Sequence, residues 1–162
     1  MNTTVNNHLE ARRLEVRPAA DDEVAAYWEK ALVAYADASN AGSSRENRLL
    51  RAYDAGRIAA LAIVRAAGYR GRGGEGHHYV TFDVARSLVT GPELRSALDE
   101  MNGVRTLRHD VEYEPEHEVD EGIVATTLDV AGRILRLGAA HLNASRPSLG
   151  ARLRSPQPRG GG

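Results

Sequence analysis

Apolar residues recur at the spacing of an α-helix in the first half of the chain. From about residue 20 they follow one another at steps of three and four, which places them on one helical face. A second stretch of this kind begins after the polar segment "NAGSSRE", in which Ser43 and Glu46 have the spacing of a capping box. Gly68 is a typical stop for this second helix. The stripe positions are Val24, Trp28, Ala31, Tyr35 and Ala38 in the first helix and Leu49, Leu50, Tyr53, Arg57, Ala60, Leu61 and Val64 in the second.

Three more helices are expected in the second half of the chain. A short one covers about 80–89. The next begins at "TGPE", with Thr90 as the cap and Pro92 in the first turn. It ends just before Pro115, because the residue that precedes a proline avoids the α conformation. The last helix covers about 116–142.

This pattern predicts an all-α fold, an up-and-down bundle of four to five helices formed by residues 18–143. No strand-type alternation longer than a few residues is visible. Residues 1–17 are polar and aperiodic, so we expect a flexible N-terminal arm. Residues 144–162 have no period, three prolines and no acidic residue, which predicts a disordered basic tail.

Composition narrows the classes of function. The net charge is −1, so the molecule as a whole does not attract nucleic acid or membranes. Cysteine is absent, which excludes disulfides, thiolate metal sites and cysteine nucleophiles. No apolar run reaches the ~18 residues that a membrane span needs, and the N-terminus lacks the apolar core of a signal peptide. We therefore expect a cytoplasmic protein with no membrane partner and no cofactor.

The loop 68–78 is rich in glycine, and its segment 71–76 matches the pattern G-x-G-x-x-G. The dinucleotide fingerprint needs a strand before the glycines, whereas a helix is predicted there, so a nucleotide-binding site of that class is not favoured. Arg70 and Arg72 are nevertheless candidate phosphate contacts, because glycines let backbone amides approach an anion.

Histidines and aspartates give a second, weaker pattern. Two adjacent histidines, a later His-Asp pair and a further aspartate are similar to the pattern of HD-type metal phosphohydrolases, in which imidazoles and a carboxylate hold a divalent ion that activates water. The residues concerned are His77, His78, His109, Asp110 and either Asp120 or Asp129.

The densest ionisable chemistry lies in "MNGVRTLRHDVEYEP", residues 101–115. Arg108 follows Met101 by two helical turns and so lies beside the buried stripe. Its stem can extend along the core with the charge in water, or the guanidinium can be a partly buried cation that needs a carboxylate or a phosphate. Asp110, Glu112 or a neighbouring helix can supply an internal carboxylate.

Residues 20–142 resemble the HEPN domain superfamily, especially its small actinobacterial members. The matching parts are "AAYWEKALVAYADA", "RLLRAYDAGRIAALAIVRAAGYR", "GEGHHYVTF" and "LRHDVEYEP". The resemblance implies a helical bundle that is generally dimeric. Many members of the superfamily are metal-independent endoribonucleases of toxin–antitoxin, abortive-infection and other defence systems.

The resemblance also implies a site. The family signature is an arginine, a polar residue and, a few residues later, a histidine; Arg108 and His109 fit the first two, and Tyr113 stands near the place of the histidine. The implied reaction is attack of an RNA 2′-hydroxyl on the adjacent phosphate, with Arg108 steadying the charge on phosphorus while His109 or Tyr113 moves protons. Tyrosine titrates near ~10 and is a poor base, so His77 and His78 are substitutes if the fold brings them close.

Two main interpretations follow. In the first, the chain is a homodimer in which the two helices that carry Arg108 line one cleft. This cleft binds RNA or a nucleotide phosphate and cuts RNA without a metal ion, and Arg105 adds positive potential. In the second, it is a non-catalytic module that partners a nucleotidyltransferase or another HEPN chain, which the missing histidine favours. The metal phosphohydrolase is a third alternative.

Overall fold

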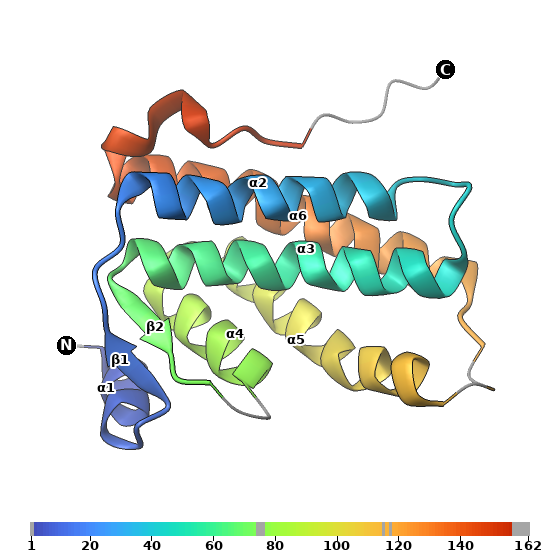
Figure 1. The fold of residues 1–162 in the computed structure, drawn as a ribbon, viewed down its shortest axis with the longest axis horizontal. Coiled ribbons are helices and arrows are strands. Elements are labelled where there is room, and N and C mark those ends of the chain that lie inside the picture. The colour runs from blue at the N-terminus through green and yellow to red at the C-terminus, as the bar shows by residue number, and fades with distance from the viewer. Residues whose placement is uncertain (1, 74–76, 115, 117, 157–162) are drawn as a thin grey trace.

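The computed structural model describes residues 2–73, 77–114, 116 and 118–156 (Figure 1). Within these residues the chain forms six α-helices, one 3₁₀ helix and a two-stranded sheet. In chain order the elements are α1 (Thr3–Glu10), β1 (Leu14–Val16), α2 (Asp21–Ala38), α3 (Arg45–Ala66), β2 (Tyr69–Gly71), α4 (His77–Leu88), α5 (Pro92–Tyr113), α6 (Glu121–Ser145) and the 3₁₀ helix η1 (Pro147–Arg152). The mostly helical fold is confirmed. No helix in the described part of the chain is long and apolar enough to cross a membrane.

The ends of α3 agree with the sequence to within one residue. Ser44, rather than Ser43, is the N-cap, and its hydroxyl accepts a hydrogen bond from the backbone N–H of Asn47 at 3.1 Å. Gly68 follows the last turn with a φ of 90°, a conformation that suits glycine and ends the helix as predicted.

The N-terminal cap of α5 and the start of α6 differ from those predicted from the sequence. The cap of α5 is Gly91, which makes no side-chain hydrogen bond, so the predicted role of Thr90 is wrong although α5 begins at Pro92. α6 starts at Glu121, later than the predicted start near residue 116. The Asp120 side chain caps it by accepting a hydrogen bond from the backbone N–H of Gly122.

The N-terminal residues are not the irregular arm that the sequence predicted. They form α1 and β1, and β1 pairs antiparallel with β2 in a sheet of two three-residue strands, which is consistent with a sequence that shows no longer strand pattern. Val5 and His8 of α1 are buried. His8 joins α1 to α4, with its Nε2 2.7 Å from Oδ2 of Asp83, and its Nδ1 accepts a hydrogen bond from Nε of Arg13 at 3.0 Å. Contacts distant in sequence therefore help to order a short segment that was expected to be flexible.

Residues 144–156 are also more ordered than the disordered tail that was predicted. α6 extends to Ser145, and η1 and the residues after it lie along α2 (Figure 1). Leu149 and Leu153 of this segment are buried. Residues 157–162 of the predicted tail lie outside the described residues.

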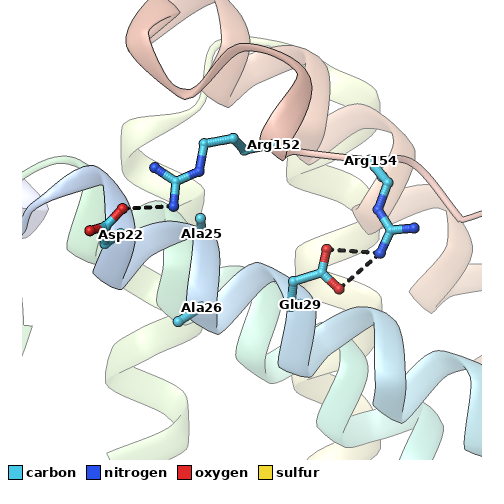
Figure 2. A pocket seen from close by; sticks show the side chains of 6 residues that line it. All are labelled: Asp22, Ala25, Ala26, Glu29, Arg152 and Arg154. Atoms are coloured by element: carbon cyan, nitrogen blue, oxygen red, sulfur yellow. Dashed lines mark hydrogen bonds and ion pairs between the residues drawn. The ribbon is translucent and has the colours of Figure 1, made fainter.

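Ion pairs hold this C-terminal segment on α2. Figure 2 shows Arg152 and Arg154 reaching Asp22 and Glu29, with N–O distances of 2.8 and 2.9 Å. Between these pairs the indole N–H of Trp28 donates to the carbonyl of Arg154 at 2.8 Å. The same basic side chains that indicated disorder in the sequence are thus neutralised by the acidic face of α2.

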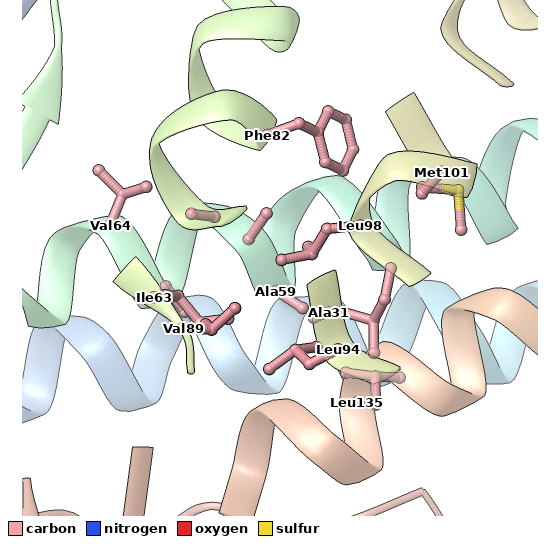
Figure 3. Close-up of a cluster of buried hydrophobic side chains, with 14 of the residues drawn as sticks. Ala31, Ala59, Ile63, Val64, Phe82, Val89, Leu94, Leu98, Met101 and Leu135 are labelled. Carbon is pink, nitrogen blue, oxygen red and sulfur yellow. The ribbon is translucent and has the colours of Figure 1, made fainter. Parts of the chain in front are cut away.

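The core surrounds α3. Figure 3 shows apolar side chains of α3, α4, α5 and α6 meeting in one cluster. The approach of α5 is close, because a Cβ on Gly56 would lie 2.8 Å from Cγ of Met101. None of residues 48–66 is exposed. A polar side chain in the middle of α3 is consequently at least partly withdrawn from water, and leaving it without a partner is costly.

Arg65 shows how α3 meets this demand at its C-terminal end. The residue is only 3% exposed. Its Nη2 lies 2.6 Å from Oε2 of Glu23 in α2. Its Nη1 donates to the carbonyls of Arg17 and Tyr69 at 2.7 and 2.8 Å. The guanidinium thereby joins α3, α2 and the segments around the sheet.

Replacing Arg65 with alanine is expected to lower the free energy of unfolding by about 2–3 kcal/mol, because Glu23 and the two carbonyls lose a charged donor. Denaturant unfolding at neutral pH measures this loss. Arg136→Ala, which removes an exposed arginine from α6, is the matched control and should change stability by no more than about 0.5 kcal/mol. Equal losses in the two variants would contradict the role given to Arg65.

Candidate functional site

Three helices bring polar side chains together on one side of α3. α4 and α5 pack against α3 on the same side and diverge from each other (Figure 1). Tyr53 and Arg57 come from α3, His78 from the first turn of α4, and Arg105 and Arg108 from the second half of α5. These five residues are called the arginine cluster below.

A hydrogen bond between α3 and α4 positions the histidine of the arginine cluster. The Tyr53 hydroxyl lies 3.1 Å from Nδ1 of His78, and the two rings are 5.8 Å apart at a tilt of 43°. The hydroxyl can donate to Nδ1, which leaves an N–H on Nε2, or it can accept from Nδ1–H, which leaves a lone pair on Nε2. One histidine can therefore present either a donor or a proton acceptor.

The two arginines of α5 lie over aromatic rings. The guanidinium carbon of Arg108 is 5.7 Å from the ring centroid of Tyr53, and that of Arg105 is 5.9 Å from the ring centroid of Tyr79. These distances are within the range of cation–π attraction. The rings hold the positive charges in place without neutralising them.

Carboxylates neutralise the arginines only in part. Nη1 of Arg108 lies 2.9 Å from Oε2 of Glu112, one turn further along α5, which is one of the internal partners expected from the sequence. Arg57 is 3.7 Å from Asp54, a carboxylate that also pairs with Arg51 at 3.2 Å. Arg105 forms no ion pair with any described residue. The arginine cluster therefore keeps an excess of positive charge.

Buried polar atoms without partners are concentrated in the same place. Among the described residues, every buried side-chain nitrogen or oxygen that lacks a hydrogen bond within the protein belongs to α3, α4 or α5 around the arginine cluster. Leaving such an atom unsatisfied costs about 1–3 kcal/mol. Water or a bound ligand would remove that cost. The atoms are Nε of Arg57, Nε of Arg105, Nε of Arg108, Oδ1 of Asn102 and Nε2 of His77.

Burial and charge set the protonation states. Burial, with the charges of Arg57 and Arg108 acting in the same direction, lowers the pKa of His78 to about 4. Burial raises the pKa of Tyr53 to about 12, although the neighbouring arginines oppose that shift. At neutral pH the imidazole and the phenol are both uncharged. Within the arginine cluster, the charged side chains at neutral pH are therefore the arginines.

This arrangement suits an anion with several oxygens. Guanidinium groups donate in a planar fork that matches a phosphate, and partial burial strengthens each charge-assisted hydrogen bond. An anion beside Arg57 and Arg108 would also offset the charges that keep His78 unprotonated. A phosphate bound at this position would therefore favour proton uptake by the imidazole.

The structure brings together some of the residues predicted from the sequence and separates others. Arg105, Arg108 and His78 lie around Tyr53, so His78 is placed where a substitute for the missing histidine is needed. The ring of His77 lies near Gly71 of β2 instead. His109 and Tyr113 lie on the exposed surface of α5, with 69% of the His109 side chain and 67% of Tyr113 accessible to solvent. Their rings are 4.7 Å apart, as their spacing of four residues predicted.

The glycine-rich segment does not add to the arginine cluster within the described residues. Arg70 lies in β2 and Arg72 just after it, both exposed, and the backbone N–H of Arg72 donates to the carbonyl of Arg13. Gly76 of the G-x-G-x-x-G pattern lies outside the described residues. No group of three or more His, Asp and Glu residues in the described parts could hold a metal ion, so the HD-type pattern receives no support there.

Sequence reasoning missed Tyr53 and Arg57 as site residues. Both fall on the apolar stripe of α3, where they were counted as core positions. The available signal was chemical: an arginine and a tyrosine four residues apart on a buried stripe both need polar partners. For Asn102, one turn before Arg105 on α5, no feature of the sequence indicates a place in the site.

Tyr53→Phe is expected to lower the free energy of unfolding by about 1 kcal/mol, because Nδ1 of His78 loses its partner. It should also free the imidazole ring to change tautomer, which ¹⁵N NMR of the histidine side chains detects. Tyr27→Phe is the control, since the Tyr27 hydroxyl makes no hydrogen bond with a described residue. An unchanged His78 spectrum in Tyr53→Phe would contradict the hydrogen bond.

Searches of this sequence and structure against families of known proteins, curated protein sequences and solved structures found no match.

Proposed function

We propose that this chain is a HEPN-like, homodimeric protein that binds the phosphate of RNA or of a nucleotide at the arginine cluster and cleaves RNA without a metal ion. One observation carries the proposal. Three arginines with buried, unpartnered Nε atoms lie around Tyr53, and two of them, Arg57 and Arg108, also act on the uncharged His78 that Tyr53 holds in place. Cleavage of an RNA phosphodiester requires hydrogen-bond donors to the phosphate oxygens and, beside them, an acceptor for the proton of the 2′-hydroxyl.

Each member of the arginine cluster has a role in this reaction. Arg57 and Arg108 bind the non-bridging phosphate oxygens. The 2′-hydroxyl oxygen of RNA forms a bond to the adjacent phosphorus, and its proton passes to Nε2 of His78. The Tyr53 hydroxyl accepts a hydrogen bond from Nδ1–H of His78 and so keeps Nε2 available for that proton. The bond from phosphorus to the 5′-oxygen breaks, and that oxygen takes a proton from water. The products end in a 2′,3′-cyclic phosphate and a 5′-hydroxyl.

A second function is favoured by a specific observation. Tyr113 stands near the place of the histidine in the HEPN signature, and it is exposed on α5. A chain without a catalytic histidine there can act as a non-catalytic module that partners a nucleotidyltransferase or another HEPN chain. In that case the arginine cluster binds phosphate but does not cut.

Cleavage of an RNA pool in EDTA tests the proposal with three variants. Arg108→Ala should lower the cleavage rate about 100-fold, because a donor to the reacting phosphate is lost. It should also reduce the slope of log affinity against log salt by about 0.7, the value for one lost contact with single-stranded phosphate. His78→Gln should lower the rate by a similar factor and leave RNA binding in place.

Arg136→Ala is the control for charge alone, because it removes an exposed arginine from α6. Cleavage and binding should both be unchanged in this variant. RNA affinity that is the same in wild type and Arg108→Ala would overturn the proposed site. Binding by wild type without any cleavage would favour the non-catalytic module.

The homodimer is the part of the proposal that rests on the resemblance to HEPN proteins. Light scattering of the purified chain should give twice the monomer mass. A monomer that binds RNA, and binds it more weakly after Arg108→Ala, would remove the shared cleft and leave the arginine cluster as a site within one chain.

A further inference from the structure

An aromatic pair, His109 and Tyr113, is exposed at the end of α5, and Nδ1 of His109 also lies 3.8 Å from Oδ1 of Asp110. His109 and Tyr113 stack on each other with ring centroids 4.7 Å apart. Tyr113 is one of only three large hydrophobic residues that are exposed in the described part of the chain. A tilted pair of flat rings, half in water, is the kind of surface on which nucleobases stack.

The pair lies on the same face of α5 as Arg105. Arg105, His109 and Tyr113 follow one another at steps of four, so each lies about 6 Å along the helix axis from the one before. Arg105 is the arginine of the cluster without a carboxylate partner among the described residues. One helical turn is a separation that a ribose can bridge between a phosphate and its base.

Acidic residues follow the aromatic pair. Glu116, Glu118 and Asp120 are exposed in the segment between α5 and α6. A phosphate group that continued past Tyr113 would meet these carboxylates and be repelled. The surface therefore suits a base on the His109–Tyr113 pair, whose nearer ring, His109, is one turn from a phosphate at Arg105, and it disfavours further phosphates beyond the base.

From this juxtaposition we infer that the exposed His109–Tyr113 pair is the base-binding part of a nucleotide site whose phosphate lies at Arg105 and Arg108. The inference rests on the proposed function, because it needs a phosphate at the arginine cluster. The ligand that fits this site is a single nucleotide or the last nucleotide of a strand. His109 and Tyr113 then bind the base and do not transfer protons.

Calorimetric titration with matched ligands tests this assignment. The ligands are inorganic phosphate, ribose 5-phosphate and uridine 5′-monophosphate, which add a sugar and then a base to the same anion. Wild type should bind the nucleotide about tenfold more tightly than ribose 5-phosphate. Tyr113→Ala should remove that difference and leave ribose 5-phosphate affinity unchanged, while Tyr113→Phe should retain it.

Val33→Ala removes an exposed apolar side chain from α2 and is the matched control; it should behave as wild type. Arg108→Ala should weaken all three ligands, which separates the phosphate site from the base site. Equal affinity of wild type for nucleotide and sugar phosphate would overturn the base site alone. Absence of binding of all three ligands would overturn the proposed function and the base site together.

A second copy of the chain is the competing occupant of the aromatic pair. Light scattering of Tyr113→Ala distinguishes it, because loss of a base site leaves the molar mass unchanged. A drop from dimer to monomer would place His109 and Tyr113 in the interface between two copies and overturn the inference.

Discussion

The burial of α3 is the constraint on which the rest of the structure depends. α2, α4, α5 and α6 all pack against it, and none of residues 48–66 is exposed. Most of its buried positions are alanine, glycine or aliphatic residues, which satisfies this constraint without polar partners. The exceptions among the buried positions are Tyr53 and Arg65, and Arg57 is a partly buried charge on the same helix. What surrounds each of them decides whether it stabilises the fold or forms a site.

The contrast between Arg57 and Arg65, both in α3, separates structure from function. Arg65 pairs with Glu23 and donates to two backbone carbonyls, so its charge is fully used inside the protein. Arg57 faces α4 and α5, has one distant carboxylate partner and keeps a buried Nε without an acceptor. The Nε atoms of Arg105 and Arg108 are likewise buried without an acceptor. A fold can carry such unsatisfied donors when a ligand completes them, and the proposed phosphate site follows from that deficit.

Sequence patterns predicted the long helices because each buries a stripe of many residues, and they missed the segments whose order depends on distant contacts. The helix α1 and the C-terminal segment are held by His8–Asp83, Arg152–Asp22 and Arg154–Glu29, and no local pattern reports such pairs. The candidate site divides in the same way. Dense ionisable chemistry indicated the arginines of α5, but the role of Tyr53 appears only when α4 folds against α3.

The protonation of His78 is the most direct test of the central claim that the arginine cluster binds an anion. NMR can follow its imidazole through a pH titration with and without sulfate, whose charge is constant over this range. Without sulfate the imidazole should stay neutral until about pH 4, because burial and the charges of Arg57 and Arg108 disfavour the imidazolium more than Asp54 favours it. Sulfate should offset the arginines and move the midpoint upward. A midpoint near the ordinary histidine value, or one that sulfate leaves unmoved, would contradict the account.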